Sequence, residues 1–331
     1  MTPNSSQAGA GPRRFAFHRL AALVGLACIA GGTAAQSSAQ VMRLIVPFAA
    51  GSYTDSVARI VAPAMAEKLG NTIVIENRAG ANGSLGADYV AKAAPDGQTV
   101  LVGGASVNTV NPNVFKTLPY DPVRDLLPVA RIGILPFLLV INPTVPATNV
   151  AELVAYAMKN PGKLAYGTPN ATTLVGMETF KRATGADITS VPYKSSPQAM
   201  ADLVGNHVQV LIADFATAMP HIQSGKAKLL AVTMQKRSTL LPDTPPMSDT
   251  VKNFDLSAWT GLLLPGKAPQ AAATRIHDAL QAALTSPDVR TRLTGIGFDI
   301  QPLGPAEFGP FLRAEIKTWA GLVKDIGFQP E

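Results

Sequence analysis

The sequence predicts an α/β fold with mainly parallel strands, large enough for two hydrophobic cores. From residue 41 onward, short apolar runs alternate with amphipathic stretches, which is the pattern of strands that alternate with helices. Of the 331 residues, 47% are hydrophobic. A single core stops growing at about 250 to 300 residues, so a chain of this length is expected to build two cores.

The expected elements follow in order along the chain. Short apolar runs predict strands at residues 44–47, 73–76, 99–103, 138–141, 164–167, 208–213 and 229–233. Helical spacing predicts helices at 55–69, 85–93, 150–159, 174–184, 197–204, 220–224, 271–284 and 307–326. In the first of these helices, apolar residues recur every three or four positions until Gly70 ends it.

Prolines mark the places where the chain is expected to pass between two lobes. They bracket an extended surface segment at 119–128, follow the strand that ends at Ile141, and form an irregular stretch before Trp259. We therefore expect crossings near residues 141 and 255. Lobe 1 would then be discontinuous, with residues 41–140 plus 256–331, and lobe 2 would comprise residues 141–255.

The first 39 residues have the composition of a secretory signal peptide. They contain Arg13, Arg14 and Arg19, no acidic residue, and an apolar run over residues 20–35. This pattern predicts export by the general secretory route, with cleavage after Ala35 or Ala39.

Charge and cysteine content exclude several kinds of partner and site. The predicted leader holds three of the 28 basic residues and none of the 22 acidic ones, and the remaining charges are scattered. Because no basic run or nucleic-acid motif is present, no nucleic-acid partner is expected. The only cysteine, Cys28, lies in the leader, so neither a disulfide nor a cysteine nucleophile is expected in the mature chain.

The segment at 44–55 has the pattern of an anion-binding turn. A buried strand runs through small residues, including Ala49 and Gly51, into the start of a helix, where Ser52, Thr54 and Asp55 can act as caps. A helix start leaves about four backbone N–H groups unpaired and carries roughly half a positive charge, which favours a carboxylate or phosphate. The alternative is an ordinary turn between a strand and a helix.

A second segment of this kind lies in the other predicted lobe, at 164–173. The hydroxyls of Thr168, Thr172 and Thr173 precede or open a helix, although Pro169 removes one backbone donor. Two such helix starts, facing one another across a cleft, would hold one acidic ligand. The alternative is a polar loop with a capping threonine.

Polar residues after two further strands are weaker candidates for ligand contact. Ser106 and Asn108 follow the strand at 99–103 and are able to hydrogen-bond a ligand or serve as plain turn residues. Asp214 follows the strand at 208–213, at the end where α/β proteins bind ligands. Its carboxylate would accept a bond from a ligand ammonium or hydroxyl, or cap the next helix.

No catalytic residue, metal site or cofactor is expected. His207, His221 and His277 have neither metal-ligand spacing nor a nucleophile nearby in the sequence. The chain has no nucleophile elbow, phosphate-binding loop, dinucleotide fingerprint or zinc-hydrolase motif.

Several short motifs occur along the chain in a recognisable order and spacing. They lie at 43–51 with Asp55, at 76–78 followed by Gly80 and Gly83, and at 95–97, 118–122, 160–167, 191–194, 202–205 and 231–233. In this respect the chain resembles the tripartite tricarboxylate transporter substrate-binding proteins, also called the Bug family, over essentially its whole mature length.

The resemblance implies a two-lobed periplasmic binding protein of the second topological type, a Venus flytrap with a ligand cleft between the lobes. Such a protein closes on a small carboxylate and hands it to a membrane transporter, and we expect it to act in the periplasm as a monomer. Carried over to this sequence, one side of the cleft comprises Phe48, Ala49, Ser52, Tyr53, Thr54 and Asp55, and the other Thr168, Asn170, Ala171 and Thr172.

Four positions depart from the family pattern. Ser52, Ser195 and Asn206 replace usual glycines, and Pro169 falls in a loop that is usually rich in Gly and Ser. Aromatic rings at Phe48 and Tyr53 favour an aromatic carboxylate, and Asp214 favours an acidic amino acid; di- and tricarboxylates are the third class. Two alternative functions are a periplasmic ligand sensor for a membrane kinase and a secreted hydrolase.

Overall fold

Nine strands form one mixed sheet in the part of the chain that the computed structural model describes, residues 41–330 without 236, 239 and 253. The order is β2-β1-β3-β9-β4-β7-β5-β6, and β8 pairs with β4. The predicted signal peptide and Cys28 lie outside the described residues. The strands are β1 (Val41–Val46), β2 (Thr72–Asn77), β3 (Thr99–Gly104), β4 (Leu126–Ile141), β5 (Leu164–Thr168), β6 (Ile188–Pro192), β7 (Val210–Asp214), β8 (Lys228–Val232) and β9 (Ser257–Pro265).

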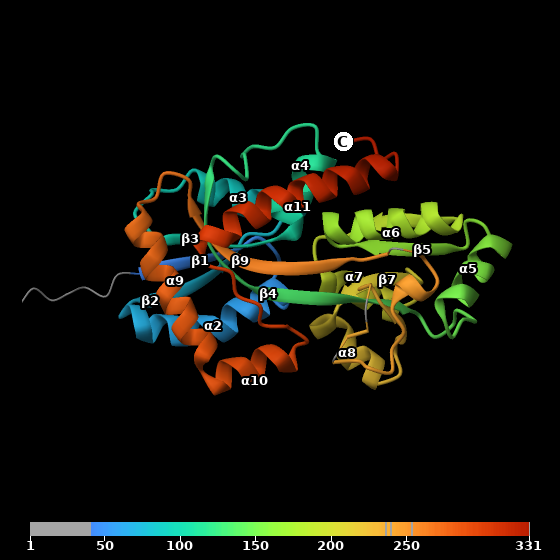
Figure 1. Cartoon of the computed structure of the whole chain (residues 1–331). Helices are drawn as coiled ribbons and strands as arrows, with labels where there is room; N and C mark the ends of the chain where they lie inside the picture. Colours follow the sequence, from blue (N-terminus) through green and yellow to red (C-terminus); the bar gives the residue numbers. More distant parts are fainter. Residues whose placement is uncertain (1–40, 236, 239, 253, 331) are drawn as a thin grey trace, which may run out of the picture. The chain divides into compact units, whose positions relative to one another are not determined.

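The long strand β4 belongs to both halves of this sheet. Its residues from Leu126 to Pro136 pair with β9, and those from Phe137 to Ile141 pair with β7 and β8. We call β2, β1, β3 and β9 the first half-sheet, and β7, β5, β6 and β8 the second half-sheet. Figure 1 shows β4 and β9 running between the two groups of helices.

The expectation of mainly parallel strands is wrong. Four strand pairs are parallel, whereas the four pairs that involve β4 or β9 are antiparallel. β9 returns along β3 and β4 in a stretch where no strand was expected, and β4 also runs antiparallel to β7 and β8.

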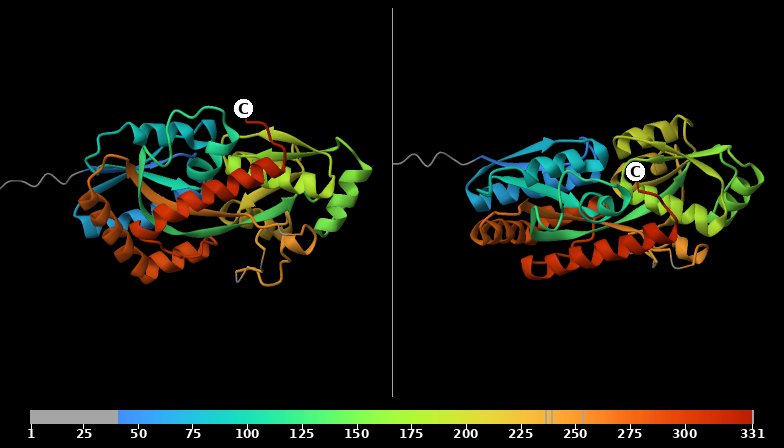
Figure 2. Two further views of the ribbon diagram at one scale, coloured as in Figure 1. Left: turned by 45° about the horizontal axis from the view of Figure 1, so that its top comes forward. Right: turned by 90° about the horizontal axis from the view of Figure 1, so that it is seen from above.

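Helices cover both faces of the sheet (Figures 1 and 2). In β1, Leu44 and Val46 belong to the core that includes α2 and α9, whereas Ile45 between them packs with α3 and α11. This alternation follows from the two-residue period of a strand. The main helices are α2 (Tyr53–Leu69), α3 (Ser84–Ala91), α5 (Val150–Lys159), α6 (Ala171–Thr184), α7 (Ser196–Val204), α8 (Phe215–Gln223), α9 (Gln270–Thr285), α10 (Pro287–Gly295) and α11 (Pro305–Asp325).

The helix at the carboxyl end of the chain also connects the halves. α11 packs against β4, and beyond its end the carbonyl of Ile326 accepts a bond from Arg182 Nη1 of α6, 3.4 Å away. The two views of Figure 2 show α11 in red along this path.

Short helical turns continue the chain after β3. The expected loop at 103–109 contains instead a π-helical turn η2 (Ser106–Val110), followed by α4 (Asn111–Val114). A 3-10 turn η1 (Ala81–Gly83) precedes α3, and η3 (Met247–Asp249) precedes β9.

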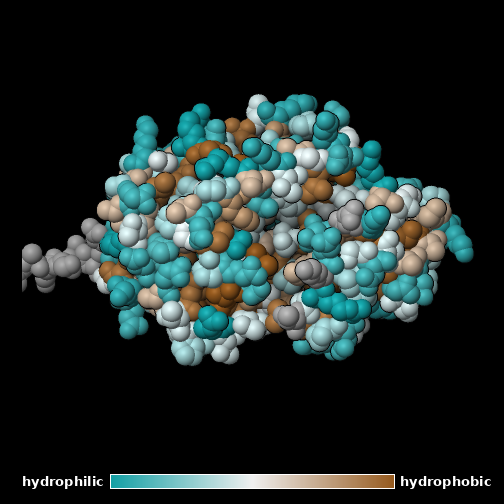
Figure 3. Space-filling model, in the orientation of Figure 1, coloured by the Kyte–Doolittle hydropathy of each residue, from teal (hydrophilic) through white to brown (hydrophobic). Residues whose placement is uncertain are grey.

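None of the helices in the described part of the chain is long and apolar enough to span a membrane. On the face seen in Figure 3, hydrophilic residues surround small hydrophobic areas.

Candidate functional site

Three helices begin at the same small cavity. α2 starts after Ser52, whose Oγ accepts the backbone N–H of Asp55 at 3.3 Å. α6 starts after Asn170, whose Oδ1 accepts the N–H of Thr173 at 3.0 Å. α7 starts after Ser195, whose Oγ accepts the N–H of Gln198 at 3.4 Å. Each of these serine and asparagine caps uses a lone pair for its own helix.

The cavity between these helix starts is narrow and lined by uncharged residues. Its volume is about 10 Å³, which is room for about one water molecule. Each neighbouring helix start contributes roughly half a positive charge and unpaired N–H groups, so the cavity favours an anion without any basic side chain. It is lined by Phe48, Ser52, Tyr53, Ser106, Phe137, Pro169, Asn170, Ser195 and Ser196.

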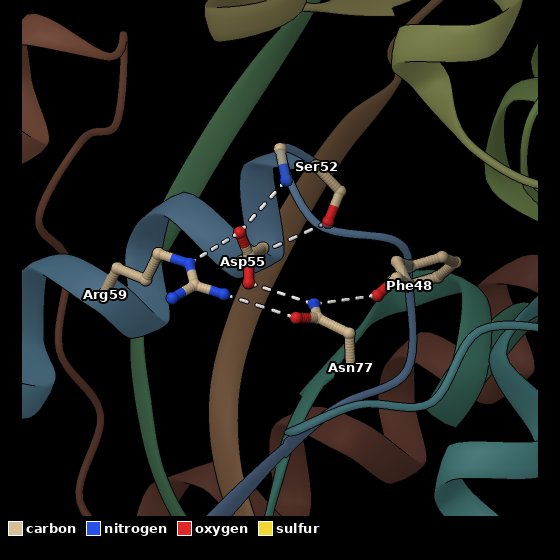
Figure 4. A network of polar contacts seen from close by, with 6 residues as sticks. Phe48, Ser52, Asp55, Arg59 and Asn77 are labelled. Atoms are coloured by element: carbon tan, nitrogen blue, oxygen red, sulfur yellow. Dashed lines mark hydrogen bonds and ion pairs between the residues drawn. The ribbon is translucent and has the colours of Figure 1, made fainter. Parts of the chain in front are cut away.

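The loop that leads into α2 is held by a polar network around Asp55 (Figure 4). The Asp55 carboxylate accepts bonds from the Gly51 N–H at 3.0 Å, Arg59 Nε at 2.9 Å and Asn77 Nδ2 at 2.9 Å. Asn77 Nδ2 also donates to the carbonyl of Phe48 at 3.0 Å. Asp55 therefore fixes the loop in place and does not line the cavity.

The network also keeps Asp55 charged. Burial raises the pKa of Asp55, but bonds from Arg59, the Gly51 N–H and Asn77, with the charge of Arg59, outweigh burial and lower this pKa below its usual value. The negative charge is thus neutralised locally by Arg59, and it leaves the adjacent helix start available to an anion.

Hydroxyl groups join the two half-sheets at the cavity. Ser106 Oγ, on the first half-sheet side, lies 2.8 Å from Thr172 Oγ1 and 3.2 Å from Asn170 Oδ1, both on α6 or its cap. Ser106 Oγ also accepts the N–H of Thr172 at 3.3 Å. The start of α6 is therefore docked directly on η2.

A wider pocket of about 430 Å³ adjoins the cavity. The two share Phe48, Pro169 and Asn170. The wider pocket also contains Thr168 and two charged residues, Glu178 and Lys194.

The sequence-based site residues fall into three groups. Those that line the cavity or the wider pocket are Phe48, Ser52, Tyr53, Ser106, Thr168 and Asn170. Thr172 contacts Ser106 across the half-sheets, and Ala171 and Thr54 are buried without lining either space. Ala49 is half-buried and lines neither the cavity nor the wider pocket. The side chains of Asp55, Asn108 and Asp214 accept hydrogen bonds from backbone N–H groups.

Tyr53 and Asn108 point into the protein. Tyr53 is 8% exposed, and burial is the main cause that raises its pKa to about 12. Asn108 Oδ1 accepts the N–H of Gly104 at 3.1 Å, which closes the turn after β3. Tyr53 therefore lines the cavity, whereas Asn108 holds the end of β3 and lines neither space.

The structure adds residues that the sequence analysis did not assign to the site. Ser195, Ser196 and Phe137 line the cavity, and Asn77 and Arg59 hold Asp55. The start of α7 has a detectable signal, because Ser195 is followed by Pro197, and serine caps and early prolines are typical of helix starts.

Known proteins resemble this chain over most of its length. Residues 57–328 match the family model described as the tripartite tricarboxylate transporter family receptor. Rpa4515 of R. palustris, solved with adipate, is 32% identical with a TM-score of 0.86, covering 89% of this chain and 100% of the other. The periplasmic binding protein BugD is 30% identical with a TM-score of 0.84 and coverages of 88% and 99%.

A further structure, MatC from Rhodopseudomonas palustris with bound malate, is 31% identical with a TM-score of 0.82. It covers 86% of this chain and 99% of that one. These proteins confirm both the resemblance and the fold class expected from the sequence, that of periplasmic solute-binding proteins. The chain belongs to the family of tripartite tricarboxylate transporter receptors.

Proposed function

We propose that this protein is a periplasmic receptor that binds a small organic acid at the cavity between α2, α6 and α7 and delivers it to a membrane transporter of the tripartite tricarboxylate type. It acts by binding and closure, without catalysis, and as a monomer. The predicted leader supports the location, and the family supports the transporter as partner.

The convergence of three helix N-termini is the observation that carries this proposal. Carboxylates bind well where backbone N–H groups and helix dipoles point at one place. The hydroxyls of Ser52, Ser195 and Ser196 add donors around the same cavity. The acids bound by Rpa4515 and MatC, adipate and malate, each carry two carboxylates, which favours a ligand with two carboxylates here.

Ligand entry requires the two half-sheets to separate. A dicarboxylate is several times larger than the water molecule that the cavity admits. The lobes we propose remain 41–140 plus 256–331 and 141–255. The change of pairing within β4 at Pro136 and Phe137, and the entry into β9 at Ser257, support a hinge close to those boundaries.

Thermal unfolding with a panel of organic acids tests the proposal. A bound acid present at about 100 times its dissociation constant adds about 2.7 kcal/mol of stability, so the melting temperature rises. Aromatic acids, acidic amino acids, dicarboxylates and tricarboxylates form the panel, with neutral sugars as controls. If no acid shifts the melting temperature, the carboxylate site is wrong. Capture of a transporter subunit, or of a sensor kinase, from solubilised membranes then decides the partner.

A further inference from the structure

The chain turns sharply after α11 and returns toward the wider pocket. Gly327 has a backbone φ of +67°, in the left-handed region that favours glycine. Its N–H donates to the carbonyl of Lys324 at 2.9 Å, and the N–H of Phe328 donates to the carbonyl of Val323 at 3.2 Å. This pair of bonds is a Schellman turn, which stops a helix and redirects the chain. The turn therefore fixes where Phe328 lies. We call residues 326–330 the C-terminal segment.

Phe328 lies between residues of the two half-sheets. It is half-buried and lines the wider pocket together with Phe48 and η1 on the first half-sheet side and α6 on the second. The helix that carries it, α11, packs mainly against η2, β4 and α4. Phe328 is thus attached to one side of the pocket and contributes to a wall that the other side shares.

α6 presents one face to the C-terminal segment. Leu174 and Glu178 line the wider pocket with Phe328, and Arg182 Nη1 donates to the carbonyl of Ile326 at 3.4 Å. Leu174, Glu178 and Arg182 are spaced by four residues, so they lie along one face of the helix. The start of α6 is docked on η2, and the C-terminal segment contacts the last turn of the same helix. α6 is therefore held at both of its ends.

The contacts of the C-terminal segment have the strength of a reversible attachment. Ile326 and Phe328 are only partly buried where they pack against the hydrophobic core. The bond from Arg182 to Ile326 is long, and the arginine is exposed. Partial burial of two apolar side chains and one such bond stabilise an arrangement without making it permanent. A contact of this kind is able to break and re-form as the half-sheets move.

We propose that the C-terminal segment is a latch that holds the protein closed in the absence of ligand, with Phe328 and Ile326 seated beside α6. This inference rests on the lobe movement of the proposed function. For the half-sheets to separate, α6 must move away from Phe328, and the bond from Arg182 to Ile326 must break. Weakening either contact therefore shifts the equilibrium toward the open state.

The distance between two spin labels measures opening in the purified protein without ligand. Labels at Asp278→Cys on α9 and Met158→Cys on α5 lie on opposite halves, at positions that are 63% exposed for the aspartate side chain and 60% exposed for the methionine. Expressed from residue 40, the chain has no native cysteine. In this background, Phe328→Ala should raise the ratio of open to closed protein at least about fivefold, because a half-buried ring is lost. Arg182→Ala, which removes one hydrogen bond, should raise it about twofold.

Two matched variants serve as controls and should leave this ratio unchanged. Phe115→Ala removes another half-buried phenylalanine, which lines neither the cavity nor the wider pocket. Arg290→Ala removes another 3.4 Å bond from an exposed arginine to a backbone carbonyl, that of Leu284.

The outcomes separate the latch from the proposed function. Distances that Phe328→Ala leaves unchanged overturn the latch, and so does an unaltered protein that is already mainly open without ligand. If Phe328→Ala does not fold, Arg182→Ala, at an exposed position, still decides. Because no ligand is present, this result is independent of whether an organic acid shifts the melting temperature.

Discussion

Two aspartates at the site, Asp55 and Asp214, have opposite surroundings. Asp55 accepts bonds from a backbone N–H, a guanidinium and an amide, whereas only one oxygen of Asp214 has a hydrogen-bond partner among the described residues. Both were expected from the sequence to bind the ligand. Their environments have different consequences: Asp55 fixes a loop and its pKa is lowered, whereas Asp214 caps α8 and burial raises its pKa.

Replacing Asp55 by asparagine should destabilise the protein in a way that depends on pH. The folded-state pKa of Asp55 is lowered, so its stabilising effect is complete above the unfolded-state pKa of about 3.9 and is lost as the pH falls through the lower folded value. At pH 7 we expect Asp55→Asn to lower the free energy of unfolding by about 1 to 3 kcal/mol. Urea unfolding at pH 7, 5, 4 and 3 measures the difference.

The difference between the two proteins should shrink as the pH falls below the unfolded-state pKa of about 3.9, because the unfolded chain then binds a proton that the folded carboxylate, with its lowered pKa, resists. Asp288→Asn, at a position whose side chain is 74% exposed, serves as the control and should change stability little. A difference that stays constant from pH 7 to pH 3 would contradict the charged network around Asp55.

Local residues of the site were predictable, but their long-range partners were not. Ser52 and Asn170 have the residue types and positions of helix caps, which single-sequence reasoning detects. Asn77 reaches Asp55 only because β2 pairs in parallel with β1 and places Asn77 opposite Val46. A contact that depends on strand register over this distance leaves no local pattern.

At the scale of elements, the start of α7 distinguishes a helix cap from a ligand contact. The Ser195 hydroxyl accepts the N–H of Gln198 and lines the cavity, so its own proton is available to a carboxylate. Asn149 caps α5 in the same way, accepting the N–H of Glu152 at 2.8 Å, but does not line the cavity. The two caps form a matched pair.

We expect Ser195→Ala and Asn149→Ala to lower stability similarly, by about 1 kcal/mol each, because each removes one helix cap. Only Ser195→Ala should weaken binding of the best acid, by about 10-fold, because it removes a bond to a charged group. Chemical unfolding and isothermal titration measure the two effects. Equal affinity in both variants would show that α7 takes no part in the site.

Two stretches that were not expected to be strands, β9 and the first part of β4, lie where unbroken apolar runs or prolines obscure the strand pattern. The first part of β4 contains Pro128 and Pro136, and its register against β9 shifts after Pro128. Prolines fit a strand at such bulges, although they normally argue against one. β9 is buried along almost its whole length and lacks the alternation that marks a half-exposed strand.

At the scale of the whole molecule, β4 joins the half-sheets on one side, and the hydroxyl contacts of Ser106 close the other. Since β4 continues through both halves while Ser106 meets α6 through only a few hydrogen bonds, separation should begin at Ser106. Net hydrogen bonds between neutral groups contribute about 1 kcal/mol each, which a conformational equilibrium can overcome.

A disulfide between these two positions should lock the molecule closed. Ser106 Oγ and Thr172 Oγ1 are 2.8 Å apart, so small shifts would bring paired cysteine sulfurs to the bond length of about 2.05 Å. Expressed without its first 39 residues, the chain contains no native cysteine to interfere. We expect the oxidised variant Ser106→Cys/Thr172→Cys to bind its acid at least about 10-fold more slowly than after reduction, because entry requires opening. Stopped-flow fluorescence with and without dithiothreitol measures the rate, and the two single variants serve as controls. Equal rates in the oxidised and reduced double variant, with the disulfide verified by mass, would show that ligands enter without separation of the half-sheets.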